Sequence, residues 1–435
     1  MLRTRTPAET LEVVLPLAKK CGITRIAEIT GLDRIGIPVF SCIRPGAADG
    51  AISVYNGKGL TDDEARVSAV MEGIERYCAE VGDRNLIFDK YSNLNPAETL
   101  NPADLILPQG INPDTVIPWY PCRDVISGED LLLPAHAVFH PVPHTHGRFM
   151  RTSTNGIASG NTFNEAALYG ICEVIERDAW SLVEASGVAG KVIDTDTIPE
   201  SPSDSSSDSH SESAEGSERG EGVASTELEK CAELRELLKR FSDNGVDVIL
   251  RDITADNGIP TIAAVSDDVR LKDPSLLCIG MGTSLSPAVA AIRAVTETAQ
   301  SRLTQIHGAR EDTTEAEFRK QIGYERTKRF NRKWFGVPES KDDMRDFADI
   351  PRFEADYCGG VCDFSKELKY ISERLQSCGT KRIFAASLST LDADIEVVRV
   401  IVPGLESFAI DNQRMGERCR NAGRNRFSGS KSARK

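Results

Sequence analysis

Three segments of the chain space their apolar residues three and four apart, as in an amphipathic helix, and keep the opposite face polar. They cover about residues 61–81, 163–185 and 287–307. The first two follow glycine-bearing turns, at residues 56–59 and 155–160, and both contain the sequence ExxER. A glycine turn followed by a carboxylate-bearing helix therefore occurs twice, which we interpret as a weak internal repeat.

A further helix is predicted at the start of the chain. Thr6 and Glu9 have the spacing of a capping box with Pro7 at the first helical position, so a helix is expected to run to about residue 20. Pro16 predicts a kink or an early end of this helix. Apolar runs predict strands at residues 37–44, 51–55, 246–250 and 396–402, of which the first two form a hairpin.

Residues 200–226 change character, because they contain almost no apolar side chains. Residues 200–227 carry eight acids and one arginine, a composition that predicts a disordered insertion. A second capping box, Thr226 with Glu229, predicts that helical structure resumes there and continues to about residue 241. The basic tail at residues 407–435 is expected to be flexible.

Composition narrows the class of protein. The net charge of −14 argues against general nucleic-acid binding, which needs a basic face. No apolar run reaches the length of a membrane span, and the charged N-terminus does not read as a signal peptide, so we expect a cytoplasmic location without membrane contact. In such a reducing compartment, most of the eleven cysteines should be buried thiols.

The polar faces of the first two predicted helices carry candidate metal ligands. Ser68, Glu72 and Glu75 fall within about 60° of one another on the first helix. Asn161, Glu165, Glu173 and Glu176 fall within about 120° around the second. Carboxylates one turn apart repel each other unless they share a cation, and their hard oxygens suit Mg²⁺. Since Mg²⁺ prefers few carboxylates plus phosphate and water, a nucleoside triphosphate is the expected remaining ligand.

The third helix places Arg293, Glu297 and Gln300 within about 60°, whereas Arg302 points the opposite way. Arginine can hold phosphate through two parallel hydrogen bonds. A single ExxER helix could equally be a solvent-exposed face with local ion pairs. Two copies of the motif and a third polar face argue against that interpretation. Spacing alone predicts a carboxylate-rich, cation-binding interior site.

Three blocks of the sequence, at residues 56–80, 154–180 and 292–312, resemble the signature blocks of YcaO-domain proteins. The resemblance implies an α+β fold with mixed sheets packed against helices, in two pseudo-repeated lobes around a central ATP site. It divides the chain into an N-terminal helix and hairpin lobe (1–60), a catalytic domain (61–406) and the tail. Family members use ATP to activate the oxygen of a peptide amide. A nucleophile then attacks the carbonyl carbon, and phosphate leaves.

Residue roles follow from the same resemblance. It implies that the Mg²⁺ ligands are Glu72, Glu75, Glu173 and Glu176. It implies that ATP is contacted by Arg3, Thr10, Ser68, Asn161, Glu165, Arg177, Arg293 and Glu297. No side chain of the protein is expected to act as a nucleophile, because phosphoryl transfer depends on positioning and charge neutralisation.

The product is left open by the residues. The chain lacks the proline-rich tail that azoline-forming cyclodehydratases commonly have, and its opening is similar to archaeal members that pair with a TfuA protein. The resemblance therefore implies sulfide attack to give a thioamide, with thioglycine in the methyl-coenzyme M reductase α subunit as the expected product and a homodimer as one possible assembly. Azoline formation is the alternative, and an ATP-binding accessory protein without catalysis is a third hypothesis.

Other motifs are interpreted without a catalytic role. The histidines at positions 136, 140, 144 and 146 are interrupted by prolines, so they cannot form a helical metal pair. Cys358 and Cys362 form a lone CxxxC that is expected to be structural. Gly280 and Gly282, ahead of the third helix, could cradle phosphate through backbone N–H groups.

Overall fold

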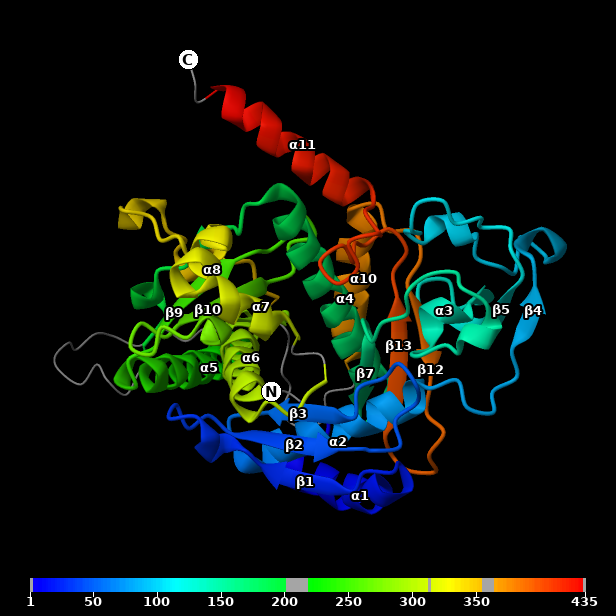
Figure 1. Ribbon diagram of the computed structural model, residues 1–435, viewed down its shortest axis with the longest axis horizontal. Coiled ribbons are helices and arrows are strands. Elements are labelled where there is room, and N and C mark those ends of the chain that lie inside the picture. The colour runs from blue at the N-terminus through cyan, green and yellow to red at the C-terminus, as the bar shows by residue number, and fades with distance from the viewer. Residues whose placement is uncertain (1–2, 201–217, 312–313, 354–363, 433–435) are drawn as a thin grey trace.

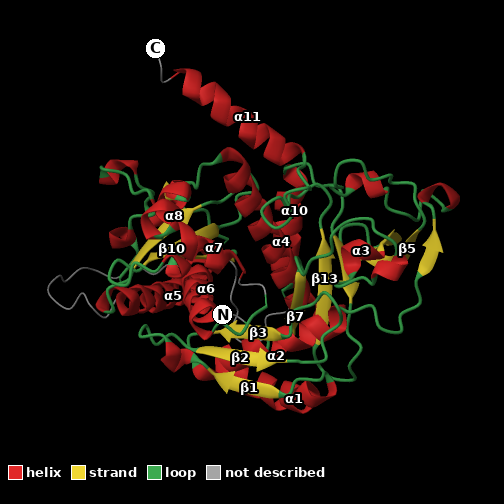
Figure 2. Ribbon diagram, in the orientation of Figure 1, coloured by secondary structure: helices red, strands yellow, loops and turns green. Residues whose placement is uncertain are grey.

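The computed structural model describes residues 3–200, 218–311, 314–353 and 364–432. These residues build three antiparallel sheets, and a long helix packs against an edge strand of each (Figure 1). The strand orders are β1-β2-β3, then β4-β5-β12-β13-β7 with β6 beside β5, and β11-β10-β9-β8. Within the described residues, helices pack against antiparallel sheets, which confirms the predicted α+β class (Figure 2).

The first sheet lies at the bottom of Figure 1 and carries two helices. Its elements are α1 (Pro7–Lys20), β1 (Arg25–Glu28), β2 (Val39–Ile43), β3 (Val54–Lys58) and α2 (Asp62–Ala79). The predicted hairpin of β2 and β3 is confirmed, with Phe40 opposite Gly57, although its second strand begins three residues later than expected. Strand β1 was not predicted.

The predicted capping box at the start of α1 is present. Thr6 accepts a hydrogen bond from the backbone N–H of Glu9, and the Glu9 carboxylate accepts one from the N–H of Thr6. The predicted early end at Pro16 is wrong, because α1 continues to Lys20. Burial of side chains such as Val14 in the core supplies tertiary packing that offsets the hydrogen bond lost at the proline.

The second sheet, at the right of Figure 1, is assembled from two distant parts of the chain. Its first part comprises β4 (Ile87–Asp89), β5 (Ile117–Asp124), β6 (Asp130–Pro134), α3 (Ala135–Val138), β7 (Ile157–Gly160) and α4 (Phe163–Ser186). Its second part comprises α10 (Ser365–Ser377), β12 (Phe384–Ser387) and β13 (Glu396–Ile401). The central position of β13 between β12 and β7 joins the C-terminal third of the chain to α4.

The third sheet carries the remaining long helices. Its elements are β8 (Lys191–Val192), α5 (Glu218–Asp243), β9 (Asp247–Asp252), β10 (Thr261–Asp267), β11 (Cys278–Thr283), α6 (Pro287–His307), α7 (Thr314–Ile322), α8 (Tyr324–Phe330) and α9 (Arg332–Phe335). Helix α6 has the predicted bounds, with Ser286 as its N-cap. Residues 201–217 of the predicted insertion, and the Cys358–Cys362 motif, lie outside the described residues.

Two boundary predictions are corrected. Helix α5 begins at Glu218, inside the predicted insertion, so Thr226 lies within a helix and is not its N-cap. Glu227, the last of the eight acids, accepts hydrogen bonds from the Ser286 hydroxyl and the Ala288 N–H at the start of α6. Part of the acidic segment is therefore structural, because a carboxylate satisfies free N–H groups at a helix N-terminus.

The tail predicted to be flexible contains helix α11 (Glu417–Ser432), which runs outward from the molecule (Figure 1). Its first turn is fixed to α4, since Arg418 donates hydrogen bonds to both carboxylate oxygens of Asp178, at 3.1 and 2.8 Å. Glu406 accepts hydrogen bonds from the N–H groups of Gly416 and Cys419. Composition did not reveal this docking, because it depends on a few polar contacts of high sequence separation.

The largest apolar cluster crosses the predicted boundary at residue 60. It joins Leu11 of α1 and Ile74 of α2 to Leu133 of β6 and Phe384 of β12. The N-terminal segment thus shares its core with the rest of the chain. Among the described residues, no helix is long and apolar enough to span a membrane.

Glycines allow each edge strand to cross its helix at short range. A Cβ atom on Gly57 of β3 would lie 2.5 Å from the Ala69 Cα of α2. A Cβ on Gly160 of β7 would lie 2.6 Å from the N atom of Ala166 in α4. Such distances are far below van der Waals contact, so only glycine fits. The third pair, β11 with α6, repeats this arrangement and extends the predicted repeat from two units to three.

Candidate active site

The polar faces of α2, α4 and α6 line one cleft of about 990 Å³. All twelve residues singled out in the sequence line it: Arg3, Thr10, Ser68, Glu72, Glu75, Asn161, Glu165, Glu173, Glu176, Arg177, Arg293 and Glu297. The cleft brings together members of this set up to 294 positions apart in sequence, Arg3 and Glu297. Convergence of the three polar faces is therefore the structural basis of the site.

Each ExxER motif forms a local ion pair that holds its glutamates in place. On α2, Arg76 lies 3.1 Å from Glu72, one helical turn away. On α4, Arg177 lies 3.1 Å from Glu176 and 3.7 Å from Glu173. The arginine of the motif thus neutralises part of the negative charge on its own helix.

Burial makes two of these carboxylates easy to protonate. It raises the pKa of Glu75 to about 7, although the neighbouring Arg76 and a 2.6 Å hydrogen bond from the Ser159 hydroxyl both act to lower it. Burial likewise raises the pKa of Glu176 to about 7, against the opposing charge of Arg177. Two carboxyl groups that resist ionisation in the same cleft indicate a place where a cation would be well bound.

The N-terminal segment closes one side of the cleft on α4. Arg3 donates a 2.8 Å hydrogen bond to Glu165, whose side chain is fully buried, and Thr4 donates to the same carboxylate at 2.7 Å. Burial alone would raise the pKa of Glu165, but these partners bring it below its ordinary value. Thr10 donates a 3.1 Å hydrogen bond to the side-chain oxygen of Asn161.

Helix α6 contributes one satisfied carboxylate and one unsatisfied arginine. Glu297 lies 2.5 Å from the Lys58 ammonium and accepts a hydrogen bond from the Met281 N–H. Burial opposes ionisation of Glu297, yet Lys58 and Arg177 hold its pKa below the ordinary value. The Arg293 Nε, by contrast, is buried without a hydrogen-bond partner among the described residues. A buried, unpaired guanidinium N–H in a cleft is suited to a phosphate oxygen.

The glutamates do not form a complete metal site by themselves. Within the described residues, no three histidine, cysteine, aspartate or glutamate side chains are grouped so that they could hold a metal ion. A hard cation such as Mg²⁺ keeps several waters and takes phosphate oxygens as ligands, so a few carboxylates suffice to anchor it. The oxygen donors and the free Arg293 donor fit a metal–nucleotide complex better than a metal alone.

Several cleft residues were not identified from the sequence. Tyr169 lies between two arginines, with its ring centroid 3.8 Å from Arg3 and 5.5 Å from Arg293. It is four residues from both Glu165 and Glu173, a spacing that could have placed it on the same helix face. Lys58 is the ion-pair partner of Glu297. Ser159 follows no such periodicity, because it reaches Glu75 from a strand.

The structure also shows the roles of the glycines ahead of α6 and of Arg302. Gly280 and Gly282 do not line the cleft; a Cβ on Gly282 would lie 2.8 Å from the Ala294 N of α6, so the glycine serves strand–helix packing and not phosphate binding. Arg302 is fully buried on the opposite side of α6, paired with Asp33 and Asp268 at 2.9 and 3.1 Å.

The fold and the cleft define a class of protein in which paired glutamates and arginines meet between three helices. Residues 56–406 match the YcaO family, described as YcaO cyclodehydratase, ATP- and Mg²⁺-binding. The chain therefore belongs to the YcaO family. Family membership makes ATP and Mg²⁺ its cofactors and places it among ATP-dependent enzymes of the cyclodehydratase type.

Individual relatives agree with this assignment. An uncharacterized protein of Methanothermobacter thermautotrophicus strain Delta H is 42% identical over 418 residues, covering 96% of this chain and 98% of the relative. A Rhizobium leguminosarum bv. trifolii protein, described as uncharacterized and in the tfuA 3′ region, is 32% identical over 93% of this chain and 88% of its own.

Solved structures show the same fold. YcaO from Methanopyrus kandleri, bound with AMPPCP and Mg²⁺, superposes with a TM-score of 0.70 and 26% identity, covering 95% of each chain. A heterocyclase in complex with substrate and cofactor superposes with a TM-score of 0.72. At 20% identity over 93% of this chain and 53% of the other, that likeness concerns the fold alone.

Proposed function

We propose that this protein uses ATP and Mg²⁺ to activate a backbone amide of a peptide or protein, and that sulfide then attacks the activated carbon to give a thioamide. The observation that carries the proposal is that two ExxER glutamate pairs converge in one cleft with Arg293, whose buried Nε has no hydrogen-bond partner among the described residues. When bound, MgATP supplies the phosphoryl group that turns the amide oxygen into a leaving group.

Acidic residues are proposed to bind the metal ions, and basic residues are proposed to bind the phosphate groups. Glu72, Glu75, Glu173 and Glu176 offer oxygen ligands from two facing helices, which suits the cations of a nucleotide triphosphate complex. Arg293 and Arg177 offer guanidinium donors to phosphate oxygens. Arg3, Thr10, Ser68, Asn161, Glu165 and Glu297 complete the proposed nucleotide contacts. Fixed charges of this kind stabilise phosphoryl transfer without a covalent intermediate on the protein.

The nucleophile is proposed to come from outside the chain. No cysteine is among the described residues that line the cleft, and eight of the nine described cysteines are buried. Burial raises the pKa of Cys172, on the same helix as Glu173, to about 12, so it is held as an unreactive thiol. A thioamide therefore needs an external sulfur donor.

Relatives support thioamide formation over the alternative product. The Rhizobium relative is described by its position in the tfuA 3′ region. Two other relatives come from archaea whose genus names refer to methane, Methanothermobacter and Methanopyrus. A TfuA-like protein that delivers sulfur, and a glycine of the methyl-coenzyme M reductase α subunit as substrate, are accordingly the proposed partners. The family description as cyclodehydratase favours azoline formation as the second candidate.

Mass spectrometry separates the two products. The full chain is incubated with MgATP, sulfide, the TfuA-like partner and a glycine-containing peptide of the reductase subunit. Exchange of oxygen for sulfur raises the peptide mass and releases ADP and phosphate, whereas ring closure on a Cys, Ser or Thr removes one water. Loss of water from a cysteine peptide would replace the thioamide proposal with the azoline one. If ADP is released with neither the glycine peptide nor the cysteine peptide present, the enzyme proposal loses support; the result that favours an accessory role is no ADP release with either peptide.

A further inference from the structure

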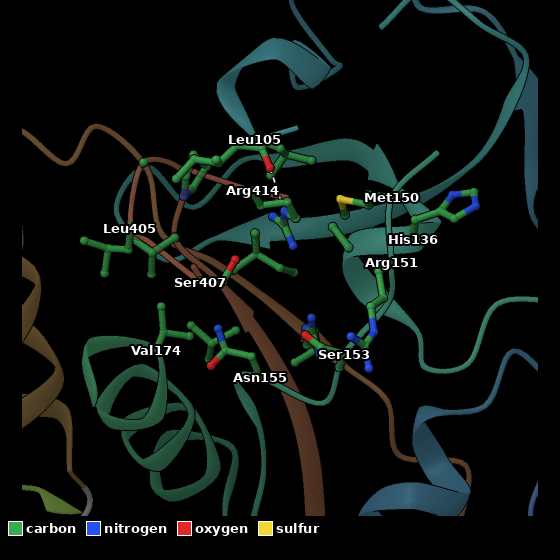
Figure 3. Close-up of a pocket in the computed structure, with 18 residues that line it drawn as sticks. Leu105, His136, Met150, Arg151, Ser153, Asn155, Val174, Leu405, Ser407 and Arg414 are labelled. Carbon is green, nitrogen blue, oxygen red and sulfur yellow. Dashed lines mark hydrogen bonds between the residues drawn. The ribbon is translucent and has the colours of Figure 1, made fainter. Parts of the chain in front are cut away.

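A second, smaller cavity lies behind the wall of the cleft. Its volume is about 60 Å³, enough for a few water molecules. It is partly open, and its lining includes β13 and the loop after it, residues 153 and 155, and Val174 of α4 (Figure 3). Nothing in the proposed reaction cycle so far uses it.

The described side chains that line this cavity include positive charges and no carboxylates. Among the described residues that line it are three arginines, Arg151, Arg399 and Arg414, and no aspartate or glutamate. The active-site cleft differs, because each ExxER arginine there has a carboxylate partner. Of the three, only Arg399 is buried, and a buried cation without an ion-pair partner is costly, so its surroundings indicate a place for an anion.

Hydrogen bonding identifies donors left for such an anion. Arg399 donates through Nη1 to the Ser153 carbonyl at 2.7 Å, while its Nε is buried without a partner. Arg414 donates through Nε to the Ile106 carbonyl at 2.6 Å, and Figure 3 shows its guanidinium between Ser407 and Met150. The Ser407 hydroxyl is also buried and unpaired among the described residues.

The exposed fractions show that two of these donors are built into the interior. Arg399 and Ser407 are each 6% exposed, and Arg414 is half-buried. Burial lowers the pKa of Arg399 to about 10, although the charge of Glu173 acts to raise it. Burial also lowers the pKa of Arg414, against the charges of Asp411 and Glu406. His136 contributes no donor to the cavity, because its ring is turned away and bonds to Gly147 (Figure 3).

The cavity adjoins the active-site cleft. Ser153 and Asn155 line the cavity, whereas Thr154 and Ile157 of the same segment line the cleft. On α4, Val174 faces the cavity and the preceding residue, Glu173, faces the cleft. A ligand in the cavity would therefore be separated from Glu173 and the cleft only by the segment at residues 153–157 and by α4.

We propose that this cavity is a binding site for a small inorganic anion, held by Arg399, Arg414 and Ser407. Its volume is too small for a nucleotide. The proposed function, on which this assignment of role rests, offers two such anions: the hydrosulfide that is consumed and the phosphate that is released. Both share the chemistry of a compact anion that accepts hydrogen bonds from guanidinium groups.

The test measures anion binding to the full chain directly. Titration calorimetry with inorganic phosphate and, under anaerobic conditions, with hydrosulfide is carried out on the native protein and on Arg414→Met. Crystals soaked in bromide then locate the anion by anomalous scattering. We expect binding of at least one of the two anions, a loss of tenfold or more in Arg414→Met, and a bromide peak between Arg399 and Arg414.

Control variants make the outcome specific. Arg235→Met removes another half-buried arginine that donates to a backbone carbonyl, that of Ile198, and should leave anion affinity unchanged. Thermal unfolding of Arg414→Met checks that the variant is folded. Binding of phosphate alone would assign the site to the product, and binding of hydrosulfide alone to the substrate.

Two results would overturn the proposal: no binding of either anion by the native chain, or equal affinity in folded Arg414→Met. A cavity filled by water only would give the first. Failure of the proposed function remains distinguishable, because Glu75→Gln should lose MgATP binding and keep anion binding. If Glu75→Gln keeps both, the nucleotide site is wrong and the anion site stands.

Discussion

Glu75 illustrates how a single side chain is prepared for a cation. Its carboxylate is surrounded by Arg76, the Ser159 hydroxyl and the glutamates at positions 72 and 173, and burial outweighs the favourable partners. The group is therefore held closer to neutrality than an exposed glutamate. A divalent cation would reverse this balance, because its charge favours the ionised form.

Replacing Glu75 by Gln keeps the size of the side chain and removes the charge that a cation needs. We expect MgATP affinity, measured by titration calorimetry, to fall by tenfold or more in Glu75→Gln. Glu236→Gln, which alters an exposed ion pair with Arg240 on α5, is the matched control and should bind normally. Unchanged affinity in Glu75→Gln would remove this residue from the site.

The pKa of about 7 at Glu75 and Glu176 predicts a pH dependence of nucleotide binding. Below pH 7 the carboxyls are protonated and a cation must displace the protons, so MgATP affinity should rise as the pH is raised from about 6 to about 8. Calorimetry across this range measures the slope. In Glu75→Gln with residual binding, the slope should be shallower; an equally steep slope would assign the titration to other groups.

The same groups predict the opposite trend for stability without ligand. Their pKa values are raised above the ordinary value of 4.5, so the native state binds more protons than the unfolded state between about pH 4.5 and 7. Their contribution to stability is present below this window and is lost as the pH rises through 7. Thermal unfolding of the ligand-free chain in Glu75→Gln should accordingly show a smaller decline of Tm over this range than the native chain does.

At the scale of elements, close crossing of a strand over a helix is the repeated design. Gly57→Ala would place a Cβ 2.5 Å from the Ala69 Cα, so β3 must move away from α2. We expect a loss of about 3 kcal/mol in the free energy of unfolding, at the upper end of overpacking costs. Chemical denaturation measures it, and a change below about 0.5 kcal/mol would show that the crossing can relax.

Gly46→Ala is the control for this substitution. Gly46 lies in the turn between β2 and β3, its φ is not positive, and a Cβ there would meet nothing within 4 Å. We expect little change in the free energy of unfolding. A large loss in both variants would point to a general cost of replacing glycine in this sheet.

Local patterns predicted the helices that carry the site well. Periodic apolar residues and capping side chains are properties of short segments, so α1, α2, α4 and α6 could be placed from sequence. The angular positions of residues on α2, α4 and α6 also identified the polar faces that line the cleft. The same reasoning could not find Ser159 or Lys58, because each reaches a glutamate on another element and no periodicity connects the two.

Composition was a weaker guide than periodicity. The acidic segment and the basic tail were interpreted from composition alone, yet Glu227 caps α6 and Arg418 holds α11 against α4. A charged side chain reads as solvent-exposed in a sequence unless its partner is known. Both partners here are far away in the chain, so only the tertiary structure shows that the charges are satisfied.

For the molecule as a whole, the C-terminal helix is coupled to the helix that carries the second ExxER motif. Asp178 directly follows Arg177 on α4, and its side chain is fully buried. Burial raises the pKa of Asp178, while the Arg418 guanidinium acts to lower it. Arg418 also lies 2.7 Å from Asp256, so one side chain of α11 joins two distant parts of the fold.

Arg418→Met would leave the buried Asp178 carboxylate without its ion-pair partner. Removing one member of a buried pair costs about 3–5 kcal/mol, because the remaining charge stays desolvated. We expect a loss toward the lower end of this range, since Arg418 is 22% exposed and water can enter. Nucleotide affinity should also fall, because Arg177 and Glu176 precede Asp178 on the same helical turn. Denaturation and calorimetry measure the two effects.

Lys239→Met supplies the comparison, because Lys239 forms an exposed pair with Asp243 one turn away on α5. Exposed pairs of this kind contribute less than about 1 kcal/mol, so neither stability nor nucleotide binding should change measurably. If Arg418→Met loses stability and keeps full nucleotide affinity, α11 supports the fold without influencing the site. If it loses neither, the Asp178 carboxylate must be neutral or rehydrated in the variant, and the ion pair does not couple α11 to the active site.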